Sequence, residues 1–246
     1  MMISQPLKTA CHAILAMAMV LASSVVGRAA EMTHVIELFT SQGCSSCPPA
    51  DRLLASLARN PNTVALSFAV DYWDYIGWKD VFASPIFTAR QQAYARLSAD
   101  GRVYTPQAVI DGVKADVGSD KASVDRDIGA PVGLGGAMSV PMTIEESNGY
   151  LHVDIGAGQA TGASVYVLRV VASTTVEIRR GENSGRSVTY TNVVRAMNKI
   201  GSWSGQPAHF DMLELKADGE GYVVLLQAGD PAKPAVILAA AKTAGL

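Results

Sequence analysis

Cysteine is scarce in this 246-residue chain, which contains three cysteines in all. Cys11 lies within residues 1–29, which are expected to be removed as a signal peptide, so the rest of the chain contains only Cys44 and Cys47. Two cysteines allow a single intrachain bridge, which excludes the class of small scaffolds held together by many disulfides. Any cysteine chemistry therefore depends on this one pair.

An excess of charge of one sign is also missing. The 20 Lys and Arg residues nearly balance the 22 Asp and Glu residues, and they form no basic run. Nucleic-acid-binding proteins present a basic patch, so we expect no nucleic-acid partner. Histidine is equally sparse, and His34, His152 and His209 show none of the spacings typical of metal-ligand sets. The sequence therefore predicts no metal site.

Long apolar runs are confined to the N-terminus. Residues 13–26 are apolar or small, follow a weakly basic start at 1–8, and precede Gly27-Arg28-Ala29. This run is shorter than the ~20 residues of a spanning helix, and the three parts are typical of a secretory signal. We expect residues 1–29 to be a signal peptide. The protein is therefore expected to be periplasmic or secreted, with no stable membrane anchor after cleavage. An N-terminal anchor is the alternative.

The most informative motif is Gly43-Cys44-Ser45-Ser46-Cys47-Pro48. An apolar, strand-like segment at 35–39 precedes it, and a helical pattern follows it. Cysteines three positions apart on a strand-to-helix turn can form a disulfide and reopen it. A structural disulfide and a two-thiolate metal site are the alternatives, but a bridge over so short a loop stabilises little. The motif therefore favours redox chemistry, with a redox-active Cys44–Cys47 disulfide and no other cofactor.

The two cysteines have different expected roles. Cys44 is expected to be a partly exposed nucleophile whose pKa is lowered by nearby helix N–H groups, and Cys47 the resolving thiol. Residues before proline disfavour helical dihedral angles, and both Cys47 and Pro48 precede prolines. We therefore expect the regular helix to begin only at Pro49, which would weaken its effect on Cys44.

The following segments complete an α/β pattern. Residues 63–70 read as a buried strand, Ser84-Pro85 opens a helix, and Asp111-Gly112 marks a hairpin turn. This order resembles the thioredoxin fold over residues 31–129. The resemblance implies that Pro106 is a cis proline beside the two cysteines, and that the backbone of Thr105 pairs with a client strand.

Longer blocks narrow the resemblance. Residues 37–51, 70–80 and 104–107 resemble an uncharacterised secreted bacterial family, domain-of-unknown-function family 1223, and residues 179–195 extend the likeness toward the C-terminus. That family is grouped with thioredoxin-like proteins. The resemblance implies a fold and no particular substrate.

Glu37 is a candidate proton acceptor on the strand that leads to the motif. Thioredoxins carry a buried acid at the place of Leu38, one residue away, and a shift of one residue changes the face of a strand. The alternative is an ordinary carboxylate paired with Arg or Lys.

Aromatic residues cluster in the loop after the second strand, at 71–80. The loop should lie at the carboxyl edge of the sheet, where open α/β sheets bind ligands. Tyr72, Trp73 and Trp78 are therefore predicted to form a lip that holds a client peptide or a small molecule. Alternatively, the rings cover the edge of the core.

A stretch rich in glycine, residues 129–136, suggests a domain junction. We predict a thioredoxin-like domain at 30–130 and a mainly antiparallel, β-sandwich-like domain at 131–246. The second domain is predicted from seven β-favouring runs, at 140–144, 150–155, 163–172, 174–179, 187–196, 208–213 and 222–227. Residues 236–241 fit either a last strand or a short helix.

The sequence thus predicts a periplasmic thiol-disulfide oxidoreductase. Its expected partners are client protein thiols or a periplasmic redox partner. The alternative is a non-catalytic binding protein that keeps the fold and holds a soft metal at the two cysteines, or a ligand at the aromatic lip.

Overall fold

The computed structural model describes residues 32–98, 100–130, 136–159 and 162–246. The predicted signal peptide and its cleavage point lie outside these residues, as does most of the predicted domain junction. Within the described ranges, no helix has both the length and the apolar character needed to cross a membrane.

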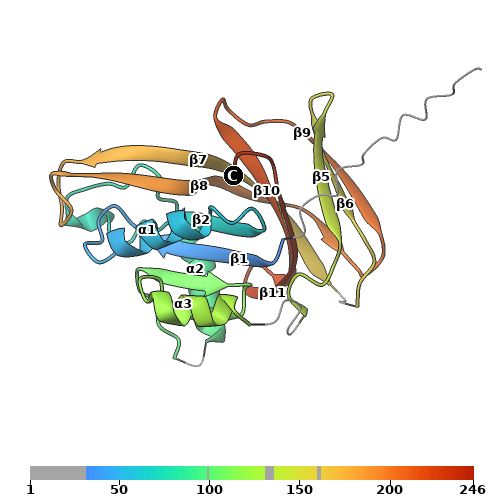
Figure 1. Cartoon of the computed structure of the whole chain (residues 1–246), viewed down its shortest axis with the longest axis horizontal. Helices are drawn as coiled ribbons and strands as arrows, with labels where there is room; N and C mark the ends of the chain where they lie inside the picture. The colour runs from blue at the N-terminus through green and yellow to red at the C-terminus, as the bar shows by residue number, and fades with distance from the viewer. Residues whose placement is uncertain (1–31, 99, 131–135, 160–161) are drawn as a thin grey trace, which may run out of the picture.

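An eight-stranded mixed sheet runs through the molecule, in the order β11-β10-β7-β8-β2-β1-β3-β4 (Figure 1). Its N-terminal strands are β1 (His34–Thr40), β2 (Thr63–Ala69), β3 (Gln107–Ile110) and β4 (Lys114–Val117). β1 pairs in parallel with β2 and antiparallel with β3. Every residue of β1 and β2 is buried, as expected for strands that are covered on both faces.

Helices cover both faces of this part of the sheet. They are α1 (Pro48–Leu57), α2 (Pro85–Leu97) and α3 (Lys121–Ile128), and the short 3-10 helix η1 (Asp74–Ile76) lies in the loop between β2 and α2. Successive residues of a strand face opposite sides, and Ile36 and Leu38 pack with α1 and α3 while Phe39 packs with α2. The predicted start of α2 is confirmed: Pro85 follows the cap Ser84, whose hydroxyl accepts from the Ile86 N–H.

The C-terminal half is β-rich, as predicted. It contributes β5 (Met142–Ser147), β6 (Tyr150–Ile155), β7 (Ala163–Ile178), β8 (Arg186–Trp203), β9 (Ala208–Leu213), β10 (Glu220–Asp230) and β11 (Lys233–Lys242). The prediction of separate runs at 163–172 and 174–179 was wrong. β7 continues through Ser173, because no glycine, proline or asparagine there turns the chain.

The two halves share the main sheet. β2 and β8 pair in parallel at Ser67 and Val193, and the Asn192 side-chain amide donates to the Ala65 carbonyl at 2.9 Å. β5, β6 and β9 form a separate antiparallel sheet that packs over β7, β10 and β11. The division at 130 and 131 stays a prediction, and the structure adds that strands on both sides of it are hydrogen-bonded.

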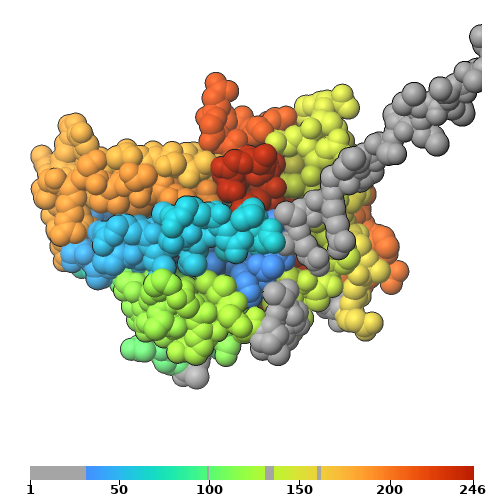
Figure 2. Space-filling view, in the orientation of Figure 1, coloured from blue at the N-terminus to red at the C-terminus, as the bar shows by residue number. Residues whose placement is uncertain are grey.

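β7 and β8 form a long hairpin that extends beyond the β5-β6-β9 sheet toward α1 (Figure 1). Figure 2 shows this hairpin, in orange, lying against the blue segment that carries the two cysteines. We refer to residues 179–185, which join the strands, as the hairpin tip. A mixed sheet with few helices fits the predicted α/β class, and the thioredoxin assignment stays a prediction.

Candidate functional site

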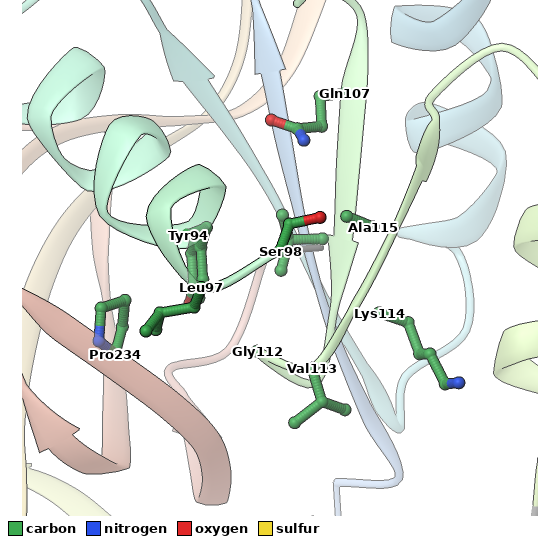
Figure 3. Close-up of a pocket in the computed structure, with 10 residues that line it drawn as sticks. Tyr94, Leu97, Ser98, Gln107, Gly112, Val113, Lys114, Ala115 and Pro234 are labelled. Atoms are coloured by element: carbon green, nitrogen blue, oxygen red, sulfur yellow. The ribbon is translucent and has the colours of Figure 1, made fainter. Parts of the chain in front are cut away.

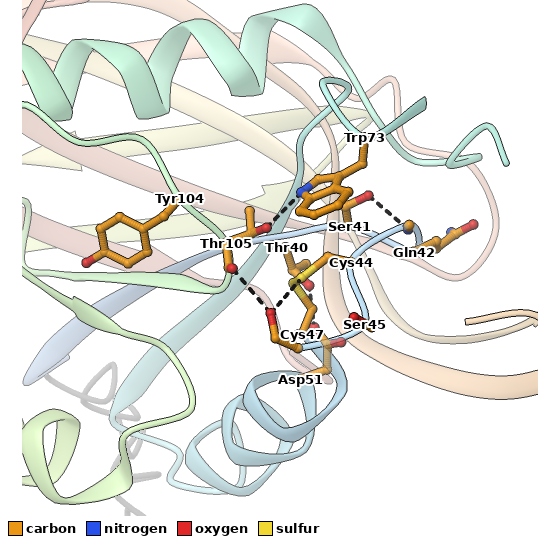
Figure 4. Close-up of a disulfide and its surroundings, with 12 residues drawn as sticks. Thr40, Ser41, Gln42, Cys44, Ser45, Cys47, Asp51, Trp73, Tyr104 and Thr105 are labelled. Carbon is orange, nitrogen blue, oxygen red and sulfur yellow. Dashed lines mark hydrogen bonds between the residues drawn. A yellow bond between two sulfur atoms is a disulfide. The ribbon is translucent and has the colours of Figure 1, made fainter. Parts of the chain in front are cut away.

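Cys44 and Cys47 form a disulfide at the turn between β1 and α1 (Figure 4), with their α-carbons 5.4 Å apart. The Cys47 N–H donates to the Cys44 carbonyl at 3.2 Å, which closes the turn. α1 begins at Pro48 and not at the predicted Pro49, and Cys47 adopts helical dihedral angles. The bias against such angles before proline is overcome here because the Cys47 carbonyl accepts hydrogen bonds from the N–H groups of both Ala50 and Asp51.

The expectation that Cys44 is partly exposed was wrong. Both cysteines are 0% exposed, whereas Ser45 and Ser46 between them are exposed. The hairpin tip lies against residues 42–47, which we call the cysteine loop, and forms hydrogen bonds with its backbone across 137 to 141 positions of the chain. Because neither cysteine is exposed, direct attack by a protein thiol on either sulfur requires the surrounding residues to move.

Asn183 fixes the hairpin tip on the cysteine loop. Its buried side-chain amide donates to the carbonyls of Gln42 and Cys44 at 2.9 and 2.8 Å. The Arg186 guanidinium donates to the amide oxygen of Asn183 at 3.0 Å, which orients the group. The Ser45 N–H donates to the Glu182 carboxylate at 3.2 Å, and hydrogen bonds from Ser45 lower the pKa of that carboxyl.

Replacing Asn183 with alanine should loosen this cover. The change leaves the Gln42 carbonyl without its side-chain donor and removes one of the two donors to the Cys44 carbonyl, which we expect to lower the free energy of unfolding by about 1–3 kcal/mol. It should also speed reduction of the Cys44–Cys47 disulfide by a small reductant, measured by thiol titration over time. Ser184→Ala, on the exposed side of the same tip, is the control and should leave the rate unchanged. Equal reduction rates in the two variants would show that the tip does not control access.

Pro106 and Thr105 lie beside the disulfide, as predicted. The Thr105-Pro106 peptide bond is cis. The Ser46 hydroxyl donates to the Thr105 carbonyl at 3.4 Å and lies 3.3 Å from the Cys44 sulfur. The Thr105 carbonyl thus has an internal partner in this structure, and pairing of its backbone with a client strand stays a prediction.

Two of the predicted lip residues hold the loop that surrounds the disulfide. The indole N–H of Trp73 donates to the Thr105 hydroxyl, and that of Trp78 donates to the side-chain oxygen of Gln42, both at 2.8 Å. Tyr72 packs against the main core, and burial raises the pKa of its phenol. These contacts support the alternative reading, in which the rings cover the core edge; ligand binding by them stays a prediction.

Glu37 lies on the wrong face of β1 to serve the cysteines. It is fully buried on the α2 side and forms a double ion pair with Arg90, at 2.7 and 2.9 Å, while the Tyr94 hydroxyl donates to it at 2.5 Å. Although burial disfavours the charged guanidinium, the Glu37 carboxylate holds the pKa of Arg90 above its ordinary value. Glu37 is therefore not placed to accept a proton from the cysteines. It is a carboxylate paired with Arg90, as the alternative prediction had it.

The buried acid beside the cysteines is Asp51, which the sequence reading missed. It follows Cys47 by four residues at the start of α1, so both project from one face of the helix (Figure 4). Thr40 donates to one carboxyl oxygen at 2.8 Å, and the other oxygen is buried without a partner among the described residues. Burial raises the pKa of Asp51 to about 7.

A second buried acid, Asp80, is hydrogen-bonded to the backbone of the cysteine loop at Gln42. The Asp80 carboxylate accepts from the N–H groups of Gln42 and Phe82, each at 2.8 Å. Burial raises the pKa of Asp80 to about 6. Tyr190 of β8 lies near both carboxyls, and its pKa is raised by burial and by their charges. Near the cysteine loop, burial therefore moves the pKa values of two carboxyls, Asp51 and Asp80, toward neutral pH.

Clefts open on two sides of the sheet. One, of about 620 Å³, lies between the start of α1 and β8 and is lined by Asp51, Arg52 and Arg186 among others, so solvent reaches the neighbourhood of the buried carboxyl. The other, of about 310 Å³, lies between the end of α2 and the β3–β4 hairpin (Figure 3), lined in part by Ser98 and Lys114. Neither cysteine lines this second cleft, and we assign it no role.

Comparison with known proteins places the chain in a family. Residues 35–227 match the family described as protein of unknown function (DUF1223). The chain belongs to the DUF1223 family. The matched range of this DUF1223 protein contains both the cysteine loop and the hairpin tip that covers it. No curated protein matches the chain.

Two solved structures are similar to this DUF1223 protein. A protein from Agrobacterium tumefaciens shares 34% sequence identity, with 87% of this chain and 95% of that chain covered and a TM-score of 0.78. HBP35 of Porphyromonas gingivalis shares 9% identity, with 87% of this chain and 75% of that chain covered and a TM-score of 0.60. The second likeness concerns the fold alone.

Proposed function

We propose that this DUF1223 protein is a periplasmic or secreted thiol-disulfide oxidoreductase with Cys44 and Cys47 as its redox couple. The observation that carries the proposal is the pairing of the disulfide with Asp51, a buried carboxyl whose pKa is about 7. Such a group can donate or accept a proton where a thiol is made or consumed. The cis peptide at Thr105-Pro106 beside the sulfurs supports the same proposal.

The strand order supports a thioredoxin-like fold for the N-terminal half. β2, β1, β3 and β4 are adjacent in that order, with β1 parallel to β2 and antiparallel to β3. α1 and α3 cover one face and α2 the other. This is the arrangement that the sequence resemblance implies for a domain that carries its cysteines after β1.

In the oxidising direction, a client thiolate attacks the Cys44 sulfur. The Cys44–Cys47 bond breaks, a mixed disulfide forms, and the Cys47 sulfur leaves as a thiolate. Protonated Asp51 is positioned to supply the proton that makes this leaving group a thiol. A second client thiolate then attacks the client sulfur of the mixed disulfide, which releases reduced Cys44; the client has lost two electrons and the Cys44–Cys47 pair has gained them.

A second candidate function follows from the burial of both sulfurs. In that case the chain is a non-catalytic binding protein, and the disulfide only braces the loop that carries Gln42 and the hydrogen bonds to the hairpin tip. Binding would then involve the surrounding loops. The two functions differ in whether a thiol partner can exchange with Cys44.

Trapping of the mixed disulfide tests the proposal. Cys47→Ser leaves Cys44 without its resolving partner, so with oxidised glutathione we expect a stable adduct on Cys44, detected by mass spectrometry. Cys44→Ser is the matched control and should form much less adduct on Cys47, which is expected to be the resolving thiol and not the nucleophile. Adducts of equal amount in both variants, or in neither, would support the binding protein instead.

A further inference from the structure

The antiparallel pairing of β6 with β9 brings together four polar side chains that the sequence keeps far apart. His152 lies opposite Asp211, and Asp154 lies opposite His209. Residues two apart on a strand share a face, and the intervening Leu151, Val153 and Ile155 are buried in the core. The histidines and aspartates therefore stand together on the outward face of the β5-β6-β9 sheet, whose strands are labelled in Figure 1.

The side chains converge on one point. The Asp211 Oδ1 atom lies 2.6 Å from His152 Nδ1 and 2.8 Å from His209 Nε2. The other nitrogen of His209, Nδ1, lies 2.7 Å from Asp154 Oδ1, so this carboxylate fixes the ring with Nε2 directed at Asp211. The two imidazole rings are stacked, with centroids 6.0 Å apart.

We propose that His152, His209 and Asp211 form a binding site for a divalent transition-metal ion, with zinc as the probe. One ligand atom from each residue lies within 4.8 Å of the other two, which small side-chain rotations can adapt to metal bonds of about 2.0–2.2 Å. Two imidazoles and one carboxylate are a donor set that zinc accepts. The spacing of the histidines along the sequence did not indicate this group, because it forms only through the pairing of β6 with β9.

Asp154 acts in this site as a positioning residue. A carboxylate on the far nitrogen of a ligating histidine fixes its tautomer and raises its basicity. The histidine side chains are 28% and 50% exposed, so an ion can enter directly from solvent and water can fill the remaining coordination positions. Three protein ligands with an open position are typical of zinc sites that also bind a substrate or water.

The alternative is that the four residues form only cross-strand ion pairs, which stabilise a sheet modestly. Zinc titration by calorimetry separates the two readings. The untagged mature chain is used with its disulfide intact, so that neither thiol can bind the ion. We expect one zinc ion per chain, bound by the wild type.

Substitution of the proposed ligands tests whether they bind the ion, and substitution of an aspartate outside the cluster is the control. His209→Ala and Asp211→Asn should each weaken zinc binding by at least about tenfold, since loss of an outer-shell partner alone costs about 10–100-fold. Asp218→Asn, an exposed aspartate outside the cluster, should leave the affinity unchanged. Circular dichroism confirms that each variant is folded. Failure of the wild type to bind zinc, or equal affinity in His209→Ala, overturns the proposal and leaves the ion-pair reading.

Discussion

Glu37→Gln is expected to destabilise the protein by about 3–5 kcal/mol, the range for removing one partner of a buried ion pair. The substitution keeps the shape of the side chain but leaves the buried guanidinium of Arg90 without its counter-charge. Tyr94 and Gln227 supply only neutral contacts to that group. Urea unfolding of the oxidised protein measures the change, since the midpoint shifts at constant slope when stability alone changes.

The matched control is Glu177→Gln. Glu177 pairs with Arg179 at 3.8 Å with both side chains largely exposed, so its loss should cost less than about 1 kcal/mol. Glu37→Gln also tests whether Glu37 has a role in thiol exchange. Because Glu37 faces α2 and not the cysteines, Glu37→Gln should leave the pH dependence of thiol exchange unchanged. A small loss of stability together with a shifted exchange profile would contradict this account.

Asp51→Asn is expected to change how stability depends on pH. Burial raises the pKa of Asp51 from 3.8 to about 7 in the folded state, so the native protein binds a proton there that the unfolded chain releases. The resulting stabilisation is fully present below about pH 4 and is lost as pH rises through 7. A shift of this size corresponds to a change on the order of 4 kcal/mol. The asparagine variant lacks this change.

Unfolding free energies measured at intervals from pH 4 to pH 8 test the prediction. The wild type should lose stability across this range, and Asp51→Asn should lose clearly less. Asp80, whose pKa burial raises to about 6, remains in the variant and accounts for a residual slope of the same sign. Identical slopes in the two proteins would show that Asp51 does not carry the buried proton.

The local features of the site could be predicted from the sequence. The cysteine pair and the hairpin turn at Asp111-Gly112 each depend on residues close together in the chain, and the structure places both as expected. Pro106 lies far from the cysteines in the chain, and its cis peptide bond was implied only by the family resemblance. The strand face of Glu37 was also decidable, because alternation along a strand is strict. Local patterns could not predict that Arg90 of α2 would be the ion-pair partner of Glu37.

The features that sequence reasoning missed depend on contacts between distant segments. The hairpin tip covers the disulfide through Asn183, 139 positions from Cys44, and nothing in the pattern of residues 179–185 predicts that docking. The only indication in the sequence that these residues matter was their resemblance to the DUF1223 family. His152 and His209 come together only through the register of β6 with β9, and a shift of one residue would separate them.

The reduction potential of the Cys44–Cys47 disulfide tests the central claim most directly. A chain that begins at Ala30 is equilibrated in glutathione buffers of known poise, and the thiols are then trapped and counted by mass, with Cys44→Ser as the control. We expect a reversible two-electron transition well above about −300 mV, in the range of known exchange catalysts. A disulfide that stays oxidised until the potential falls below about −300 mV, as inert structural bridges do, would contradict the account.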